Sequence, residues 1–275
     1  MTTMTTGPGT ARVASHYRLA DAVRMEWLKL RTIRTPRWIG LVLVASIIGT
    51  GIAVLSYYPG HWAHLSAAGK AQFDPTNAGF TGMAIGQLAI ATAGVLVITS
   101  EYSSGSIRST LAAIPSRPLL LAAKAITFGL AALVVGELTC LAAFGIGQYV
   151  VLRAPAAHVS FADPTALRAV LMMGAYVALI GLLGLGIGAV VRHTAGGIAL
   201  VVGVVFVVPM VLQAFPASVK DSVGQYLPML IAENSISTVK PIAYSLSPWT
   251  GLLMLCLYAA VALAAGGWLL ARRDA

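Results

Sequence analysis

Six apolar stretches, each long enough to cross a lipid bilayer, constrain this chain more than any other feature of its sequence. A helix needs about 20 predominantly apolar residues to cross the hydrocarbon of a membrane. Ionised side chains occur in only one of the six stretches, with Lys124 near its start and Glu137 near its middle. The stretches cover residues 38–58, 82–100, 119–151, 169–191, 195–215 and 249–271. The sequence therefore predicts an all-α integral membrane protein with six transmembrane helices.

The composition agrees with a membrane as the solvent. Hydrophobic residues fill 58% of the 275 positions and charged residues only 10%, whereas about a quarter of the residues of a soluble domain are charged. We treat residues 17–275 as one transmembrane domain. Residues 1–16, rich in Thr and Gly, lack the apolar core of a signal peptide and are predicted to form a disordered tail.

The basic residues predict which side of the membrane each loop faces. When the six spans are laid out in order, thirteen of the 18 basic residues share the side of the N-terminus and five lie opposite. Cytoplasmic loops of membrane proteins carry the excess of Lys and Arg, so both termini are predicted to lie in the cytoplasm, with the plasma membrane as the location. This topology accounts for the net charge of +9, and no nucleic-acid partner is expected.

Residues 17–37 predict a helix that lies flat on the cytoplasmic surface of the bilayer. Apolar side chains recur at helical spacing from Leu19 to Ile33, while basic side chains face elsewhere, which is the pattern of an interfacial amphipathic helix. Pro36 is expected to break this helix where the chain turns into the first span.

Glu26 is unusual because it projects close to the apolar stripe of that helix. One explanation is a solvated carboxylate paired with Lys29, one turn further on. The other is a contact with a cytoplasmic partner, and the sequence leaves both open.

The loop between the second and third spans, residues 101–118, predicts a second short cytoplasmic helix. Ser104 or Ser106 can cap this helix, and Ile107 and Leu111 would lie on one of its faces. A short rigid helix on the cytoplasmic side suits a handle for a partner protein. A plain solvated connector is the alternative.

At these two segments the sequence resembles the permease subunits of the ABC-2 family of ATP-binding-cassette transporters. Such permeases typically begin with a cytoplasmic amphipathic helix like Glu-Trp-Leu-Lys-Leu-Arg at residues 26–31 here. They follow the second span with Glu-Tyr-x-x-Gly-Ser/Thr-Ile/Leu-Arg, here residues 101–108. The likeness continues at Pro-Ser-Arg, residues 115–117, leading into Lys124, and covers nearly the whole chain after residue 17. It implies the fold of ABC-2, or type V, exporters.

The resemblance also implies which residues meet a separate cassette ATPase. Residues 105–111 would be the coupling helix that docks into a groove of the ATPase, with Glu101 at its root. The first helix would brace the same partner through Glu26, Trp27 and Lys29. The coupling contacts expected on this basis are Glu101, Gly105, Ser106, Ile107, Arg108 and Leu111. ATP and Mg²⁺ would bind to that partner, and no cofactor is expected on this chain.

The resemblance further implies a segment after the fifth span that dips into the outer leaflet as two short helices. Residues 219–232 offer an apolar stretch too short to span the membrane, with a plausible turn at Leu227-Pro228. An ordinary outer loop is the alternative.

Six spans make a thin wall for a transport pathway. Two copies, or this chain with a similar one, are therefore expected to face each other across a central cavity. Gly184-x-x-x-Gly188 and Gly82-x-x-x-Gly86 allow close helix approach, and packing within the bundle is favoured over dimerisation.

Glu137 is the main candidate for a pathway residue, because an ionisable group at mid-membrane depth is costly unless it is paired or hydrated. A pathway role and a helix-to-helix hydrogen bond both stay open for it. Gln87 and Gln148 are further candidates for lining the same cavity.

The predicted function is that of a permease subunit which forms an export pathway for a hydrophobic or amphipathic substrate. The chain has no Gly-x-x-x-x-Gly-Lys-Ser/Thr motif, so the energy is expected to come from another subunit. An ion-coupled secondary transporter is the alternative, although it would ordinarily show several intramembrane acids. An intramembrane enzyme would need clustered catalytic groups.

The remaining histidines and cysteines carry no predicted chemistry. His61 and His64 lie in an outer loop with no third metal ligand in view, so no metal site is expected. Cys140 and Cys256 fall inside apolar spans and are expected to be small buried hydrophobes.

Overall fold

The computed structural model describes residues 18–152, 159–238 and 245–272, and every regular element in these ranges is a helix. The tail predicted over residues 1–16 lies outside the described residues. Six helices are long and apolar enough to cross a membrane, which confirms the predicted number of spans. They are α2 (Arg34–His61), α5 (Met83–Ser103), α7 (Arg117–Gly145) with the π turn η2 (Ile146–Val151), α8 (Pro164–Val191), α9 (Thr194–Val202) with η3 (Gly203–Val207) and α10 (Val208–Leu212), and α13 (Pro248–Arg272).

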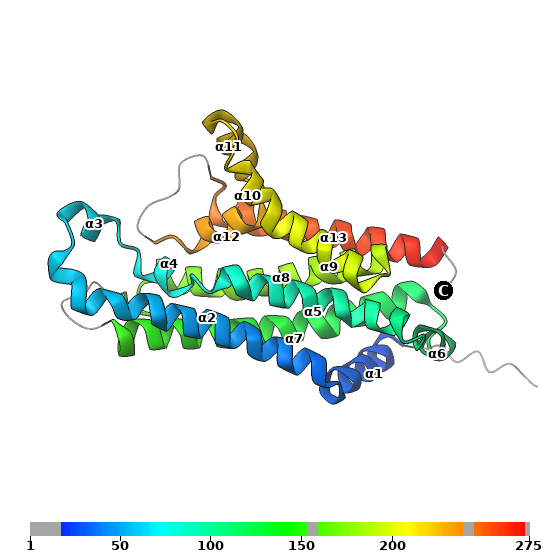
Figure 1. Ribbon diagram of the computed structural model, residues 1–275. Coiled ribbons are helices and arrows are strands. Elements are labelled where there is room, and N and C mark those ends of the chain that lie inside the picture. Colours follow the sequence, from blue (N-terminus) through cyan, green and yellow to red (C-terminus); the bar gives the residue numbers. More distant parts are fainter. Residues whose placement is uncertain (1–17, 153–158, 239–244, 273–275) are drawn as a thin grey trace, which may run out of the picture.

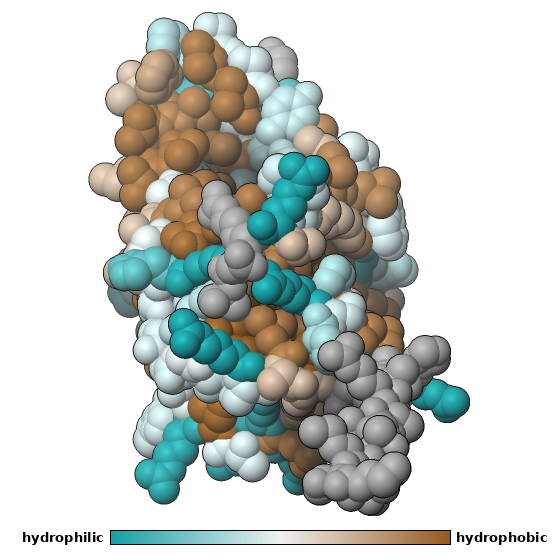
Figure 2. Space-filling view, turned by 90° about the vertical axis from the view of Figure 1, so that its right-hand side faces the viewer, coloured by the Kyte–Doolittle hydropathy of each residue, from teal (hydrophilic) through white to brown (hydrophobic). Residues whose placement is uncertain are grey.

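The long helices lie side by side along the molecule, with α1 (Leu19–Thr32) and α6 (Ile107–Ala113) at one end and α3 (Ala67–Gln72) at the other (Figure 1). We call these the α6 end and the α3 end. Figure 2 views the α6 end, where hydrophilic side chains stand out between apolar ones. Exposed basic residues of this region include Arg24, Arg31, Arg34, Arg108 and Arg272.

Helix α8 forms the centre of the bundle, since α5, α7 and α13 all pack along it. In its most apolar stretch 72% of the residues are buried, against 17% for α13. Glycines bring the helices close: a Cβ at Gly184 would meet the backbone of Ala91, and one at Gly188 would meet Val95. Both partners belong to α5, and the glycines of the Gly82 motif lie against α2 in the same way. Both small-residue motifs therefore pack within the bundle.

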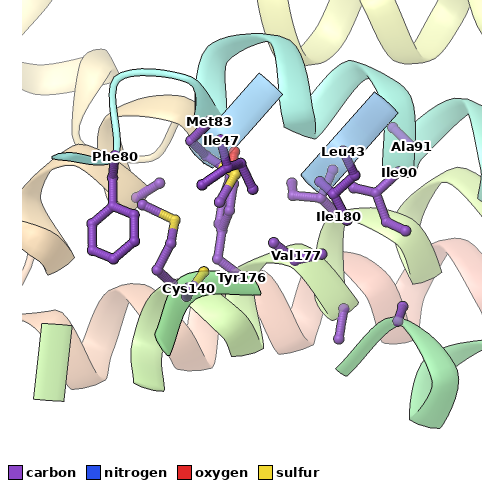
Figure 3. Close-up of a cluster of buried hydrophobic side chains, with 14 of the residues drawn as sticks. Leu43, Ile47, Phe80, Met83, Ile90, Ala91, Cys140, Tyr176, Val177 and Ile180 are labelled. Carbon is purple, nitrogen blue, oxygen red and sulfur yellow. The ribbon is translucent and has the colours of Figure 1, made fainter. Parts of the chain in front are cut away.

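The largest cluster of buried apolar side chains lies where α2, α5, α7 and α8 meet (Figure 3). Leu43 and Ile47 of α2 reach into it and are completely buried. Tyr176 of α8 is also enclosed, and its hydroxyl donates a hydrogen bond to Gln87 Oε1. A buried phenol needs such an acceptor, so this contact fixes α5 against α8.

The boundary between α1 and α2 differs from the prediction. The chain becomes extended at Ile33, and α2 begins at Arg34, so the predicted break lies three residues before Pro36, which stands in the first turn of α2. The ring of a proline clashes with the carbonyl four residues earlier, here that of Thr32, the last residue of α1. The first turn of a helix tolerates proline because its missing N–H needs no partner.

The fifth span contains a π turn, η3, directly before Pro209. A proline inside a helix removes one hydrogen bond and crowds the preceding turn, and a π turn is a usual way to absorb this irregularity. From this point the chain leans away from the bundle in Figure 1.

Two short helices follow the fifth span, α11 (Ala217–Gly224) and α12 (Pro228–Ile236). This confirms the predicted pair with its turn at Leu227-Pro228, over a longer range than 219–232. Helix α12 packs back against α8 and α13, whereas α11 projects beyond them (Figure 1). Entry of this pair into the outer leaflet stays a prediction.

A network of polar contacts closes the α3 end. Asp74 caps α4 (Pro75–Gly79) by accepting from the backbone N–H groups of Thr76 and Asn77, both at 3.0 Å. Its carboxylate also accepts from the backbone N–H of Thr238 at 2.6 Å, beyond α12. Asp74 thus joins two segments that are 164 positions apart.

Candidate functional site

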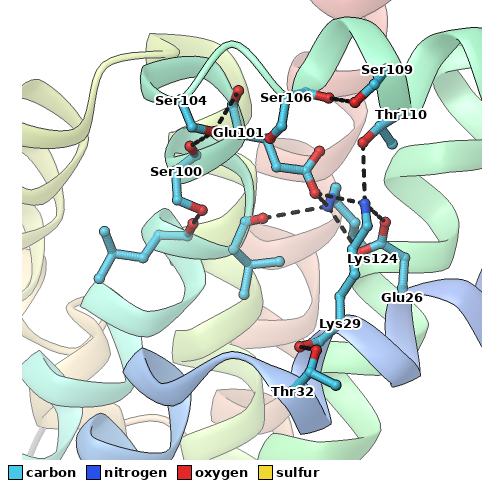
Figure 4. A network of polar contacts seen from close by, with 12 residues as sticks. Glu26, Lys29, Thr32, Ser100, Glu101, Ser104, Ser106, Ser109, Thr110 and Lys124 are labelled. Carbon is cyan, nitrogen blue, oxygen red and sulfur yellow. Dashed lines mark hydrogen bonds and ion pairs between the residues drawn. The ribbon is translucent and has the colours of Figure 1, made fainter.

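Four ionisable side chains meet at the α6 end of the bundle (Figure 4). Lys29 Nζ lies 3.1 Å from Glu26 Oε1 and 3.0 Å from Glu101 Oε1. Lys124 Nζ lies 2.9 Å from Glu26 Oε2 and 2.6 Å from the same Glu101 Oε1. We call these four residues the charged cluster.

The charged cluster connects four helices. Glu26 and Lys29 belong to α1, Glu101 to α5 and Lys124 to α7. Lys29 also donates to the hydroxyl of Thr110 on α6 at 3.2 Å. A single ammonium group therefore links α1, α5 and α6.

Burial makes these contacts strong determinants of the local structure. The side chain of Lys124 is only 1% exposed and that of Glu26 only 6%. An isolated buried charge is expensive, and removing one partner of a buried pair typically costs about 3–5 kcal/mol. For Lys29, burial alone would lower the pKa, but the nearby Glu26 and Glu101 outweigh burial and raise the pKa above 10.5. The two carboxylates thus hold Lys29 in its charged form.

Helix α6 follows a tight turn at Gly105, which has a φ of 71°. A residue with a Cβ is strained in this left-handed conformation. The predicted short helix is confirmed, and Ser106 takes the N-cap position as predicted, but the expected capping hydrogen bond is absent. Ser106 stands at the N-cap without a capping hydrogen bond, because its hydroxyl pairs with that of Ser104 at 2.9 Å.

The two faces of α6 have different surroundings. Ile107 is buried with Ala22 of α1 and Leu120 of α7, in a small apolar cluster next to the charged cluster. Arg108 and Ser109 are exposed on the other face. The apolar side of α6 therefore anchors the helix to the bundle and leaves a polar surface free.

A comparison with known families identifies the chain. A family model described as "ABC-2 family transporter protein" matches residues 27–275. The chain belongs to the ABC-2 transporter family. The match begins in α1 and includes α6 and all six spans, so this ABC-2 permease is a multi-pass membrane component of transport and is not itself catalytic. No curated protein matches the chain significantly.

Helix α1 turns only part of its predicted apolar stripe to the bundle, where Val23 and Leu30 pack against buried side chains. Ala22 and Glu26 are its buried residues, and the helix packs on α7. Trp27 is 44% exposed, and Leu19 and Ile33 are exposed as well. Glu26 is thus neither solvated nor on the surface. The expected pair with Lys29 is present, but Lys124 is a second partner that the sequence did not reveal.

The expected contact residues divide between surface and interior. Gly105, Ser106 and Arg108 are exposed on the permease surface. Glu101 and Ile107 are buried, and Leu111 is half-buried, so these three support the surface from beneath.

The three pathway candidates do not come together. Gln148 is tied into the α3 end, where its amide donates to the carbonyl of Pro75 at 3.1 Å and accepts from the N–H of Val159 at 2.9 Å. Gln87 lies in the wall of a different space, a cavity of about 210 Å³ beneath α12. Within one chain the two amides therefore lie in separate surroundings, and their place in a pathway between two copies stays a prediction.

Glu137 faces α8, where its carboxyl group lies directly against Gly174. A Cβ at position 174 would collide with the carboxyl group in this position, so a larger residue there would require the Glu137 side chain to move. Oε2 of Glu137 has no hydrogen-bond partner among the described residues. The helix-to-helix contact is present, but the described residues supply no hydrogen bond to this oxygen.

The histidines and cysteines form no cluster in the described ranges. No group of three or more His, Cys, Asp or Glu side chains in that part of the chain could hold a metal ion. His61 stacks on Tyr57 with ring centres 3.9 Å apart. Cys140 is buried as expected, but Cys256 is exposed, because α13 buries only one face against α8.

Proposed function

We propose that this ABC-2 permease forms half of an export pathway and is driven by a separate cassette ATPase that binds at the α6 end. A second permease copy, identical or similar, completes the pathway. Both termini lie in the cytoplasm, and the complex resides in the plasma membrane. ATP and Mg²⁺ bind to the ATPase subunit.

The observation that carries the proposal is the connection of α6 to three other helices. Thr110 on α6 accepts a hydrogen bond from Lys29, and Lys29 contacts Glu101 of α5 within the charged cluster. A partner that pushes on the exposed face around Arg108 therefore acts on α1, α5 and α7 together. Packed elements with fixed contacts move as units when a domain shifts.

The surface of the α6 end suits both the cytoplasmic side and a protein partner. Exposed basic residues such as Arg31, Arg34 and Arg108 fit the excess of positive charge found on cytoplasmic loops. Arg108 and the neighbouring serines offer hydrogen-bond donors to an acidic or polar groove.

The spans favour a hydrophobic or amphipathic substrate. Two of the ionised side chains, Glu101 and Lys124, neutralise each other in the charged cluster. Among the described residues of the spans this leaves Glu137 as the ionisable group at mid-membrane depth. A pathway lined by these apolar spans offers few polar groups to replace the water that an ion or a sugar loses on entering the membrane. The large exposed apolar faces of α2 and α13 face lipid or a second copy.

The test is ATP hydrolysis by the reconstituted complex. The permease is co-expressed with a candidate cassette ATPase and placed in liposomes, and stimulation of hydrolysis by the permease is measured. Arg108→Glu and Gly105→Pro are expected to abolish most of the stimulation, while Lys220→Glu on α11 is expected to keep it. Equal stimulation by all variants contradicts the proposal. Proton-driven transport by the permease alone, lost in Glu137→Gln, would instead support a secondary transporter.

A further inference from the structure

A cavity of about 160 Å³ lies between α1, α2 and α5, directly beside the charged cluster. Its walls divide into an apolar part and a charged part. The apolar part includes Leu30, Ile39, Ala93, Leu96 and Val97, and the charged part consists of Glu26, Lys29, Glu101 and Lys124. A molecule that fills this cavity needs both an apolar segment and a polar group.

The charged cluster has no spare hydrogen-bond donors. An ammonium group has three donors. Lys29 uses them on Glu26, Glu101 and Thr110. Lys124 uses them on Glu26, Glu101 and, at 3.4 Å, the carbonyl of Val97.

The cluster does have spare acceptors. A carboxylate oxygen can accept about two hydrogen bonds, but each oxygen of Glu26 accepts only one from the two lysines. Oε2 of Glu101 accepts none from the described residues. Because the two lysines and two glutamates cancel in charge, a ligand group that donates hydrogen bonds meets free acceptors without a net repulsion.

The rim of the cavity favours a negative group. The first turn of α2 contributes Thr35 and Pro36 to the lining, and its N-cap, Ile33, supplies no side-chain hydrogen bond to the free N–H groups. A helix N-terminus attracts anions. The exposed guanidinium groups of Arg31 and Arg34 lie at the same turn of the chain.

We propose that this cavity binds a phospholipid whose head group carries a primary ammonium, of the phosphatidylethanolamine type. The ammonium donates to the carboxylates of Glu26 and Glu101, and the phosphate lies at the start of α2. An acyl chain follows the apolar wall past Leu30 and Leu96. A choline head group has the same charges but no N–H donors, so it satisfies none of the free acceptors. Lipid binding at this cavity needs no ATPase, so its test is independent of the test of the proposed function.

Native mass spectrometry of the purified permease tests this proposal. The protein is stripped of lipid and offered phosphatidylethanolamine, phosphatidylcholine and phosphatidylglycerol with identical acyl chains. We expect phosphatidylethanolamine to be retained about tenfold over phosphatidylcholine, because one hydrogen bond to a charged group is worth about that factor. Equal retention of these two lipids overturns the proposal, and so does a preference for phosphatidylglycerol.

Variants locate the binding site. Ala93→Phe and, independently, Ile39→Trp add bulk from the apolar wall of the cavity and leave the four residues of the charged cluster unchanged in sequence, and both are expected to abolish the selectivity. Ala45→Phe, at an exposed position of α2, is the matched control and is expected to keep it. Selectivity that persists in both filled variants overturns the assignment to this cavity. If one of the two filled variants does not fold, the other variant still tests whether the lipid binds in this cavity. The comparison of the three lipids on the wild-type protein still tests the head-group selectivity.

Discussion

Lys124 Nζ lies 2.9 Å from Glu26 Oε2, although the two residues are 98 positions apart in the chain. The contact fastens helix α1 to the third span at a point where both side chains are buried, with exposed fractions of 1% for Lys124 and 6% for Glu26. Together with Lys29 and Glu101 it makes the α6 end one connected unit. This connection is the physical basis of the coupling that we propose.

Replacing Lys124 by methionine is expected to destabilise the permease by about 3–5 kcal/mol, because Glu26 and Glu101 then share only Lys29 inside a buried site. The free energy of unfolding, measured by denaturant titration in mixed micelles, checks this. Lys220→Met on α11 serves as the control and should change it by less than about 0.5 kcal/mol. A Lys124→Met protein as stable as the control would show that the cluster is not buried.

The same cluster predicts a change of stability at alkaline pH. The pKa of Lys29 is raised above 10.5 in the folded protein, so its stabilising effect is complete below that pH and is lost as the pH rises through the higher folded pKa. Lys29→Met should remove this component. The stability difference between wild type and variant should therefore shrink as the pH rises above 10.5, and a constant difference would contradict the prediction.

Much of this fold was predictable because the membrane imposes a length and a composition on each span. The six spans, a helix before the first span and the short helix after the second span follow from apolar length, helical spacing and turn residues. The partners of the charged cluster were not predictable, because Glu26 and Lys124 meet only after four helices have packed. A useful signal was present: each cluster residue is an ionisable group in apolar surroundings, which demands a partner. The role of Gln148 depends on backbone groups of distant loops and left no signal in the sequence.

The different surroundings of Gly94 on α5 and Gly40 on α2 predict opposite effects of replacing each by alanine. A Cβ at Gly94 would collide with the carbonyl oxygen of Gly181, so Gly94→Ala should destabilise the fold by about 1–3 kcal/mol. Gly40 on α2 has open space around it, so Gly40→Ala should be neutral or stabilise by up to about 1 kcal/mol. Thermal unfolding of the two variants in the same detergent checks the pair. The reverse order would mean that α5 and α8 are not in close contact.

Asp74 should hold the α3 end together. Asp74→Ala removes the cap of α4 and the acceptor for Thr238, and loss of a cap alone costs about 1 kcal/mol. Hydrogen exchange should therefore speed up both in α4 and just after α12. Asp163→Ala removes a comparable cap from α8 and should affect only the start of that helix. Unchanged exchange after α12 in Asp74→Ala would argue against the link between the two segments.

The central claim is that the exposed face of α6 lies in the cytoplasm and is covered by the ATPase. The most direct measurement is labelling of Ser109→Cys, with Cys140 and Cys256 replaced by alanine, by a membrane-impermeant maleimide. The account predicts labelling in inside-out vesicles, none in intact cells, and protection when the cassette ATPase is bound. Labelling from outside the cell, or labelling that the ATPase does not change, would contradict it.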